Sequence, residues 1–183
     1  RVVSWCRLNS FTDKQGTSWL QIPYYDIDGH LIGVQSRNLS YQSSSINNQS
    51  SSAPRFKFPY GHTCHIYNLP VLKLLKKGEP LFITEGASDC WAMLSSGHKA
   101  VAIPSATLLK PQDLQILSTL NSQLSTVLHM YPDQDIPGEK LYLQLTRIAT
   151  DAGLCLVRHS LPPGCKDYSD YYVRHLLAPS VNC

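Results

Sequence analysis

From residue 71 onward, short apolar runs alternate with amphipathic segments, and this alternation most constrains the fold. The runs are typical of buried β-strands, and the segments between them have the apolar spacing of helices. Strands that alternate with helices form a mostly parallel sheet through right-handed crossovers. The predicted strands are 81–85, 99–104, 126–131 and 154–161, and the predicted helices are 71–78, 87–97, 111–120, 138–153 and 167–177. The sequence therefore predicts an α/β domain with a mostly parallel, four-stranded sheet flanked by helices.

The N-terminal part of the chain has a different, β-rich texture. Within 19–40, two β-rich runs flank Asp28-Gly29, a dipeptide that tight primed turns prefer, and this pattern predicts a hairpin. The Ser-rich stretch 41–54 has no periodicity and is expected to be a flexible loop. The expected organisation is a β-rich segment (1–58), a connector (59–70), the α/β domain (71–178) and a tail (179–183).

Charge and hydropathy narrow the class of protein. Residues 1–80 hold nine Lys and Arg against four Asp and Glu, whereas residues 81–183 hold seven against nine. Such a balance suits a protein that binds a polyanion on one side and cations on the other, although charge alone does not separate this from ordinary fluctuation. No apolar run approaches the roughly 18 residues that span a bilayer, and the start has no signal-peptide core. We expect a cytoplasmic protein with no membrane partner. Because the chain does not begin with Met, we expect it to be a piece of a longer protein.

The six cysteines are scattered and include no Cys-x-x-Cys pair. The sequence HTCH at 62–65 places His62, Cys64 and His65 close together. A structural zinc site needs four ligands, usually in two spaced pairs, and the sequence has no second pair. We therefore expect no zinc, and free thiols in a reducing compartment.

Acidic residues follow three of the four predicted strands. In a parallel sheet the strand ends meet at one edge, where ligands bind. Clustered carboxylates repel one another unless a cation lies between them, and hard oxygen ligands favour Mg²⁺ or Mn²⁺. The residues at these exits are Glu85 and Asp89 after the first strand, Asp133 and Asp135 after the third, and Lys166, Asp167 and Asp170 after the last.

Each of these acidic residues also has a purely structural interpretation. A Glu-Gly pair after a strand is commonly a turn. Asp133 or Asp135 is well placed to cap the helix that follows, and Asp167 or Asp170 to cap the last helix. From the residues alone both interpretations remain open, and their occurrence together favours a metal site.

The order of these motifs resembles the TOPRIM domain, which bacterial primases, topoisomerases, some nucleases and recombination-mediator proteins share. The chain has EGASD after the first strand, DQDIPG after the third and LPPGCKDYSDYY after the last. The segments IPYYDIDGHLIGVQSRNL and PRFKFPYGHTCHIYNL also resemble the region that precedes this domain in bacterial and phage primases. The resemblance covers roughly residues 20–177. Two residues depart from the pattern: Ser105 where Gly is usual, and Pro137 where a small residue is common.

The resemblance implies roles for individual residues. The implied catalytic residues are Glu85, Asp133 and Asp135, and the implied ligands of Mg²⁺ or Mn²⁺ are these three with Asp89 and Asp167. The implied nucleotide- or nucleic-acid-binding residues are Arg37, Arg55, Lys57 and Lys166. The aromatic residues between the basic ones, Phe56, Phe58 and Tyr60, are expected either to stack on bases or to pack within the protein.

The function implied is Mg²⁺-dependent nucleotidyl transfer in primer synthesis, with a single-stranded DNA template and nucleoside triphosphates as partners. Further candidate partners are a helicase or other domains of a longer chain, which the fragment can require for activity. The alternatives are a TOPRIM-type nuclease that hydrolyses phosphodiesters and a non-catalytic DNA-binding adaptor.

Overall fold

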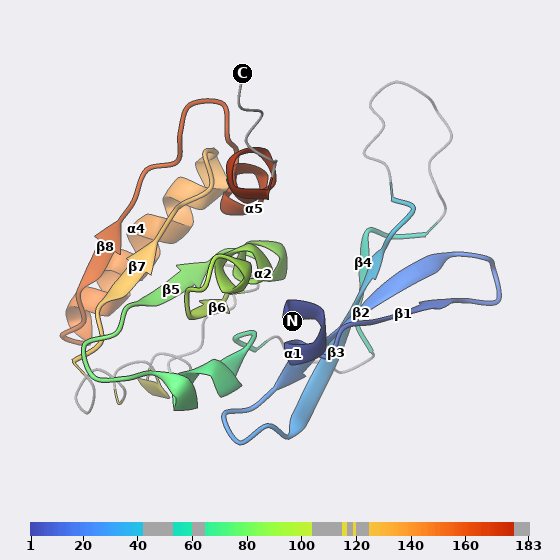
Figure 1. Cartoon of the computed structure of the whole chain (residues 1–183), viewed down its shortest axis with the longest axis horizontal. Coiled ribbons are helices and arrows are strands. Elements are labelled where there is room, and N and C mark those ends of the chain that lie inside the picture. The colour runs from blue at the N-terminus through green and yellow to red at the C-terminus, as the bar shows by residue number, and fades with distance from the viewer. Residues whose placement is uncertain (42–52, 60–64, 104–114, 117–118, 120–124, 178–183) are drawn as a thin grey trace.

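The computed structural model describes residues 1–41, 53–59, 65–103, 115–116, 119 and 125–177. These residues form two four-stranded sheets, one antiparallel near the N-terminus and one parallel in the C-terminal part (Figure 1). The predicted α/β domain with a preceding hairpin is therefore confirmed, although the N-terminal unit is a larger sheet than a hairpin. The predicted domain boundaries stay a prediction, and the Ser-rich segment lies almost entirely outside the described residues.

The parallel sheet reverses its strand order in the middle. Its strands are β5 (Leu81–Thr84), β6 (Ala100–Ala102), β7 (Leu128–Met130) and β8 (Leu156–Arg158), arranged in the order β6-β5-β7-β8. All three pairings are parallel. The chain moves from β5 to one side and then returns to the other side for β7. The gap between the ends of β5 and β7 is thus the topological switch point, where open α/β sheets bind ligands.

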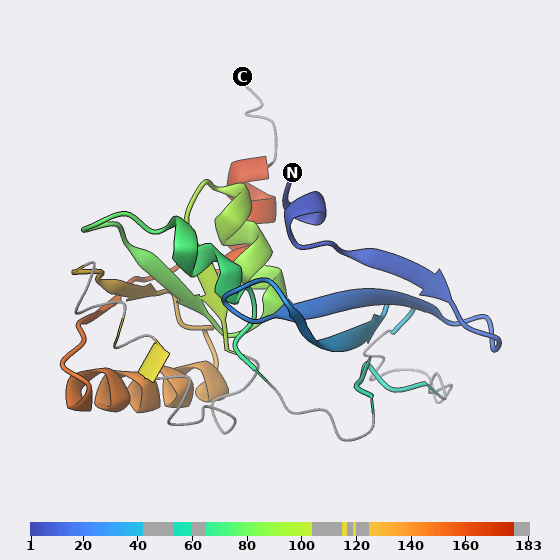
Figure 2. The ribbon, with the colours of Figure 1, turned by 90° about the horizontal axis from the view of Figure 1, so that it is seen from below.

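Helices cover both faces of the parallel sheet. Figure 2 shows α4 (Ile136–Asp151) on one face, and α2 (Ala87–Ser95) and α5 (Tyr168–Tyr171) on the other. A hydrophobic core lies on each face of the sheet. Because alternate residues of a strand point to opposite faces, Leu81 and Ile83 of β5 pack into the core on the α4 side and Phe82 into the core on the α2 side. No helix among the described residues has the length and apolar content required to cross a membrane.

Several helices differ from their predicted form. The short helix predicted over 71–78 is a 3₁₀ helix (η1) at Leu69–Leu74, so its predicted end at Gly78 is wrong. Pro70 occupies its first turn, and the chain becomes extended at Leu75. After α5, Tyr172–Leu177 continues as a π-helix (η3). Of the helix predicted over 111–120, only residues 115, 116 and 119 are described, and they are helical.

The N-terminal sheet contains the predicted hairpin and two further strands. The hairpin pairs β2 (Ser18–Tyr25) with β3 (Leu31–Asn38). Its turn is not of the primed type, because Gly29 has a φ of 88° but Asp28 has a negative φ. The Asp26 carboxylate closes this turn by accepting hydrogen bonds from the backbone N–H groups of Asp28 and His30. The sequence did not predict β1 (Asn9–Thr12), β4 (Phe56–Lys57) or the short helix α1 (Val2–Trp5).

The two sheets are joined by a buried contact. Tyr67 pairs with Ala102 at the edge of β6, and its ring packs edge-on against Tyr24 of β2 with centroids 5.2 Å apart. Trp5 of α1 donates a hydrogen bond of 2.9 Å to the Asn68 side chain. The antiparallel sheet therefore lies against the α2 side of the α/β domain, and residues from both line one groove.

Candidate active site

Two acidic residues lie at the switch point of the parallel sheet. Glu85 follows β5 directly, and Asp133 follows β7 after a short extended segment. Between them, the backbone enters α2 through Gly86, and Asp89 lies in the first turn of that helix, where it is buried. The switch point thus carries carboxylates from both central strands.

Asp135 caps the helix that follows β7. Its side chain accepts a hydrogen bond of 2.8 Å from the backbone N–H of Gly138. Pro137 lies in the first turn of α4, where a backbone N–H has no intrahelical partner, so its place in the motif is explained. The capping interpretation is correct for Asp135. Its charge nevertheless acts on Glu85, whose pKa is raised first by burial and then by Asp135.

Gly138 lets α4 lie directly against Asp133. A Cβ atom at this position would lie 2.5 Å from the carbonyl oxygen of Asp133 and 2.8 Å from its Cβ. Both separations are shorter than any van der Waals contact. The final Gly of the DQDIPG motif is therefore required by close packing, and it fixes the backbone that carries the Asp133 carboxylate.

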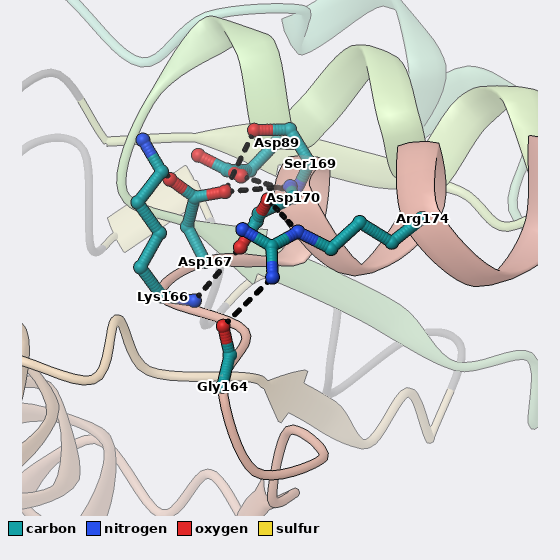
Figure 3. A network of polar contacts seen from close by, with 7 residues as sticks. All are labelled: Asp89, Gly164, Lys166, Asp167, Ser169, Asp170 and Arg174. Carbon is teal, nitrogen blue, oxygen red and sulfur yellow. Dashed lines mark hydrogen bonds and ion pairs between the residues drawn. The ribbon is translucent and has the colours of Figure 1, made fainter.

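The loop before α5 adds a further carboxylate, Asp167. Asp167 caps α5 by accepting a hydrogen bond of 2.7 Å from the backbone N–H of Asp170. Ser169 connects Asp167 to α2, since its hydroxyl donates to Asp167 and its backbone N–H donates to Asp89 at 2.8 Å (Figure 3). The sequence pattern did not single out Ser169, although a hydroxyl between two acidic residues is a recognisable signal.

Asp170 points away from Asp89 and holds the loop instead (Figure 3). One oxygen of its carboxylate pairs with Nε of Arg174 at 2.7 Å, and the other accepts from the backbone N–H of Lys166. Arg174 also donates to the carbonyl of Gly164. The carbonyl of Lys166 in turn accepts a hydrogen bond of 2.7 Å from the backbone N–H of Gln134, so the exits of β7 and β8 are tied together.

Four neighbouring carboxylates repel the negative charge of Asp133. Burial raises the pKa of Asp133 to about 8, with further contributions from the charges of Asp89, Glu85, Asp167 and Asp135. Burial also raises the pKa of Glu85, while a hydrogen bond to the Asp133 carboxyl opposes that increase. Two carboxyl groups form such a bond only when one of them is protonated. Burial likewise raises the pKa of Asp89.

The residues present fit a divalent cation. The Oε2 atom of Glu85 is buried and has no hydrogen-bond partner among the described residues, and a cation would satisfy it. Among the described residues, the carboxylates at this sheet edge (Glu85, Asp89, Asp133, Asp135 and Asp167) do not include three whose oxygen atoms all lie within 4.8 Å of one another. Mg²⁺ commonly uses one or two protein carboxylates, with water and substrate phosphates as its other ligands, so Glu85 and Asp133 suffice.

A tighter group of potential ligands lies elsewhere. Among the described residues, the donor atoms of Asp26, Asp28 and His30 in the β2–β3 turn lie within 4.8 Å of one another. These side chains already have partners, since Asp26 contacts His30 and Asp28 pairs with Lys73 at 2.6 Å. This turn is the rival candidate for a cation site among the described residues. Of the HTCH residues, His62 and Cys64 lie outside the described part of the chain.

A groove of about 690 Å³ connects this acidic edge to the N-terminal sheet. Its lining includes Glu85, Asp89, Asp133, Lys166 and Asp167 on the α/β domain, and Arg37, Arg55, Phe56 and Phe58 from β3 and the segment that contains β4. Basic residues from the N-terminal part of the chain and acidic residues from the C-terminal part therefore line the same groove. Asp135 does not line the groove.

Lys57 lies away from the groove. Its ammonium group lies 3.6 Å from the centroid of the Trp19 ring and 3.7 Å from the carboxylate of Asp13. Of the four basic residues predicted to bind nucleotides, the structure therefore brings Arg37, Arg55 and Lys166 together with the carboxylates, and Lys57 has a structural contact instead.

Comparison with known proteins agrees with this architecture. The family described as Toprim-like matches residues 82–172. No curated protein matches the chain with significant sequence similarity.

Solved primase structures share the fold over nearly the whole chain. The Escherichia coli primase catalytic core superposes with a TM-score of 0.58 at 20% identity, covering 93% of this chain and 54% of that chain. The RNA polymerase domain of Mycobacterium tuberculosis primase DnaG gives a TM-score of 0.64 at 17% identity, covering 94% and 58%. A DnaG primase catalytic domain bound to ssDNA gives 0.61 at 20% identity, covering 94% and 56%.

The chain thus spans a little over half the length of these three structures. Residues 82–172 form a Toprim-like domain, within a chain that has the fold of primase catalytic cores over most of its length.

Proposed function

We propose that this chain carries the nucleotidyl-transfer site of a primase, which joins ribonucleotides on a single-stranded DNA template with Mg²⁺ or Mn²⁺. One observation supports this most. The carboxylates of Glu85 and Asp133 meet at the switch point of the sheet, and they share a single groove with Arg37 and Arg55. Polymerisation of nucleotides needs this combination, because its substrates are polyanions and its reacting groups need a cation.

The acidic residues divide into two roles. Glu85 and Asp133 would hold the ion, and Asp135, Asp89 and Asp167 complete the negative field around them. Toprim domains generally bind divalent metal ions, in agreement with this assignment. A bound divalent ion would lower the pKa of the attacking 3′-hydroxyl and neutralise charge on the departing pyrophosphate.

The remaining chemistry belongs to the side chains of the groove. The 3′-hydroxyl oxygen forms a bond to the α-phosphorus, the bond to the β-phosphate oxygen breaks, and pyrophosphate leaves. Glu85 is the residue placed to accept the hydroxyl proton, since burial favours its protonated form. Arg37, Arg55 and Lys166 bind phosphates of the template or the triphosphate.

The function is tested by following both product and template in one reaction. The protein is incubated with single-stranded DNA, labelled ribonucleotides and Mg²⁺ or Mn²⁺, alongside Glu85→Gln and the control Asp151→Asn. Asp151 is an exposed acidic residue at the end of α4, outside the groove. We expect labelled oligoribonucleotides from the wild type and Asp151→Asn, and a loss of roughly 100-fold or more in Glu85→Gln.

Three results would contradict the proposal. Synthesis that persists in Glu85→Gln would remove Glu85 from the site. Shortening of the template without synthesis would assign the same carboxylates to phosphodiester hydrolysis. DNA binding with neither reaction would indicate a non-catalytic adaptor.

A further inference from the structure

Part of the groove lining is neither acidic nor basic. The lining also includes Ala87 and Trp91 of α2 and Ile22 of β2, of which Ile22 is only 2% exposed. Ala87 and Trp91 are four residues apart, so they lie on one face of the helix. Apolar surface of this kind does not bind phosphate. The groove therefore has a surface that suits a part of the ligand other than its phosphate groups.

The orientation of Trp91 is fixed by a buried neighbour. Its indole N–H donates a hydrogen bond of 2.9 Å to the hydroxyl of Tyr67, which is only 2% exposed. The two rings meet edge-on, with centroids 6.4 Å apart and planes at 77°. Because its one polar atom is already bonded and the side chain is only half-buried, the surface that the indole offers to the groove is aromatic carbon.

The neighbours of Trp91 indicate what this surface binds. Arg37, Arg55 and Lys166 line the same groove and suit the phosphates of a nucleotide chain. A base attached to such a backbone carries an apolar face, and stacking on an aromatic residue stabilises it by about 1–3 kcal/mol. A preoriented indole loses little conformational freedom when a base stacks on it.

We propose that Trp91 stacks against a nucleobase bound in the groove. The inference rests on the proposed function, because it takes the groove ligand to be a nucleic acid or nucleotide. The base belongs either to the single-stranded template or to an incoming triphosphate, and the same stacking chemistry serves both. Trp91 is thus a binding residue beyond the charged residues that the motifs indicate.

Tryptophan fluorescence provides a direct test. Trp19 is 1% exposed, and Trp5 lies in a different cavity, hydrogen-bonded to Asn68. Quenching by a ligand in the groove therefore reports on Trp91. The wild-type protein is titrated in EDTA with a short oligothymidylate, with an abasic oligonucleotide of equal length, and with ATP in a separate series.

We expect the oligothymidylate or ATP to quench the fluorescence, and the abasic chain to bind without quenching. Quenching by the oligonucleotide identifies a template base, and quenching by ATP identifies an incoming one. Trp91→Phe should lose the signal but keep the affinity within about 2-fold. Trp91→Leu should weaken binding of the quenching ligand by at least about 5-fold, while binding of the abasic chain stays unchanged.

Equal quenching by the abasic chain, or wild-type affinity in Trp91→Leu, would overturn the proposal. The two Trp91 variants share the loss of the indole N–H, so a difference between them reflects the aromatic ring and not the contact with Tyr67. Repeating the titration in Glu85→Gln separates the two proposals. Quenching that persists in a chain without synthesis activity supports stacking at Trp91 even if nucleotidyl transfer is disproved.

Discussion

Replacing Asp133 by Asn is expected to abolish nucleotidyl transfer and, at the same time, to stabilise the protein in EDTA at pH 8. Transfer should fall roughly 1,000-fold, because a lost metal ligand removes several kcal/mol of charge stabilisation. The stabilisation has a different cause, which is the removal of an unfavourable charge. Asp133 is half-buried and four neighbouring carboxylates repel its charge, so its ionised form is unfavourable in the folded protein without metal.

The pH dependence of this stabilisation follows from the direction of the shift. The pKa of Asp133 rises from an ordinary value of 3.8 to about 8 on folding. The folded state therefore binds more protons than the unfolded state in that interval, and wild-type stability falls as pH rises through it. Asn has no ionised form and avoids this loss. Because Asp133 keeps contact with solvent, the gain is on the order of 1 kcal/mol, or about 2–4 °C in melting temperature.

Thermal melts in EDTA from pH 4 to pH 8 measure this effect. The melting temperature of Asp133→Asn should exceed that of the wild type increasingly toward pH 8, and added Mn²⁺ should raise only the wild-type value. Asp151→Asn removes an exposed carboxylate and should follow the wild type throughout. If Asp133→Asn followed it as well, the repulsion among the sheet-edge carboxylates would be disproved.

Replacing Gly138 by Ala is expected to disrupt the site although no carboxylate is removed. The new methyl group would lie 2.5 Å from the Asp133 carbonyl oxygen, so either α4 or the exit of β7 must move. A displacement of about 1 Å at a catalytic group reduces the rate about 100-fold. Overpacking at this buried position should also cost about 1–3 kcal/mol of stability.

Synthesis rate and thermal melting in Mn²⁺ test this second expectation. Gln144→Ala is the control, because Gln144 is exposed on the same helix. That variant should retain both activity and melting temperature. Full activity in Gly138→Ala would show that the close approach of α4 does not position Asp133.

The sequence predicts the α/β sheet well because its strands are buried runs that alternate with helices. The order of the strands in the sheet is not predicted, because periodicity does not indicate which strands are neighbours. The reversal between β5 and β7 explains why the residues after those strands, Glu85 and Asp133, meet. The strands that the sequence missed lack a signal of burial: β1 is exposed along its whole length, and β4 has two residues.

Lys57 shows how the missed strand affected the predicted site. Its neighbours Phe56 and Phe58 both line the groove. Side chains alternate between the two faces of a strand, so Lys57 points to the opposite face and contacts Trp19. Had β4 been predicted, the same alternation would have separated Lys57 from the groove.

The motifs did not indicate the roles of two other residues, Trp91 and Arg174. Trp91 on an amphipathic helix looks like a core residue, and only the packing of the antiparallel sheet against α2 gives it a groove to face. Arg174 acquires its role through the loop that it closes, from Asp170 to Gly164. The groove beside Trp91 depends on contacts between segments far apart in the sequence, which periodicity does not encode, whereas Arg174 makes local contacts within the segment 164–174.

Binding of Mn²⁺ at pH 8, followed by electron paramagnetic resonance, tests the central claim most directly. Three proteins suffice: the wild type, Glu85→Gln at the switch point, and Asp28→Asn in the rival β2–β3 turn. We predict that Asp28→Asn binds Mn²⁺ like the wild type and that Glu85→Gln binds it at least about 10-fold more weakly. Wild-type binding in Glu85→Gln, or its loss in Asp28→Asn, would contradict a metal site at the switch point.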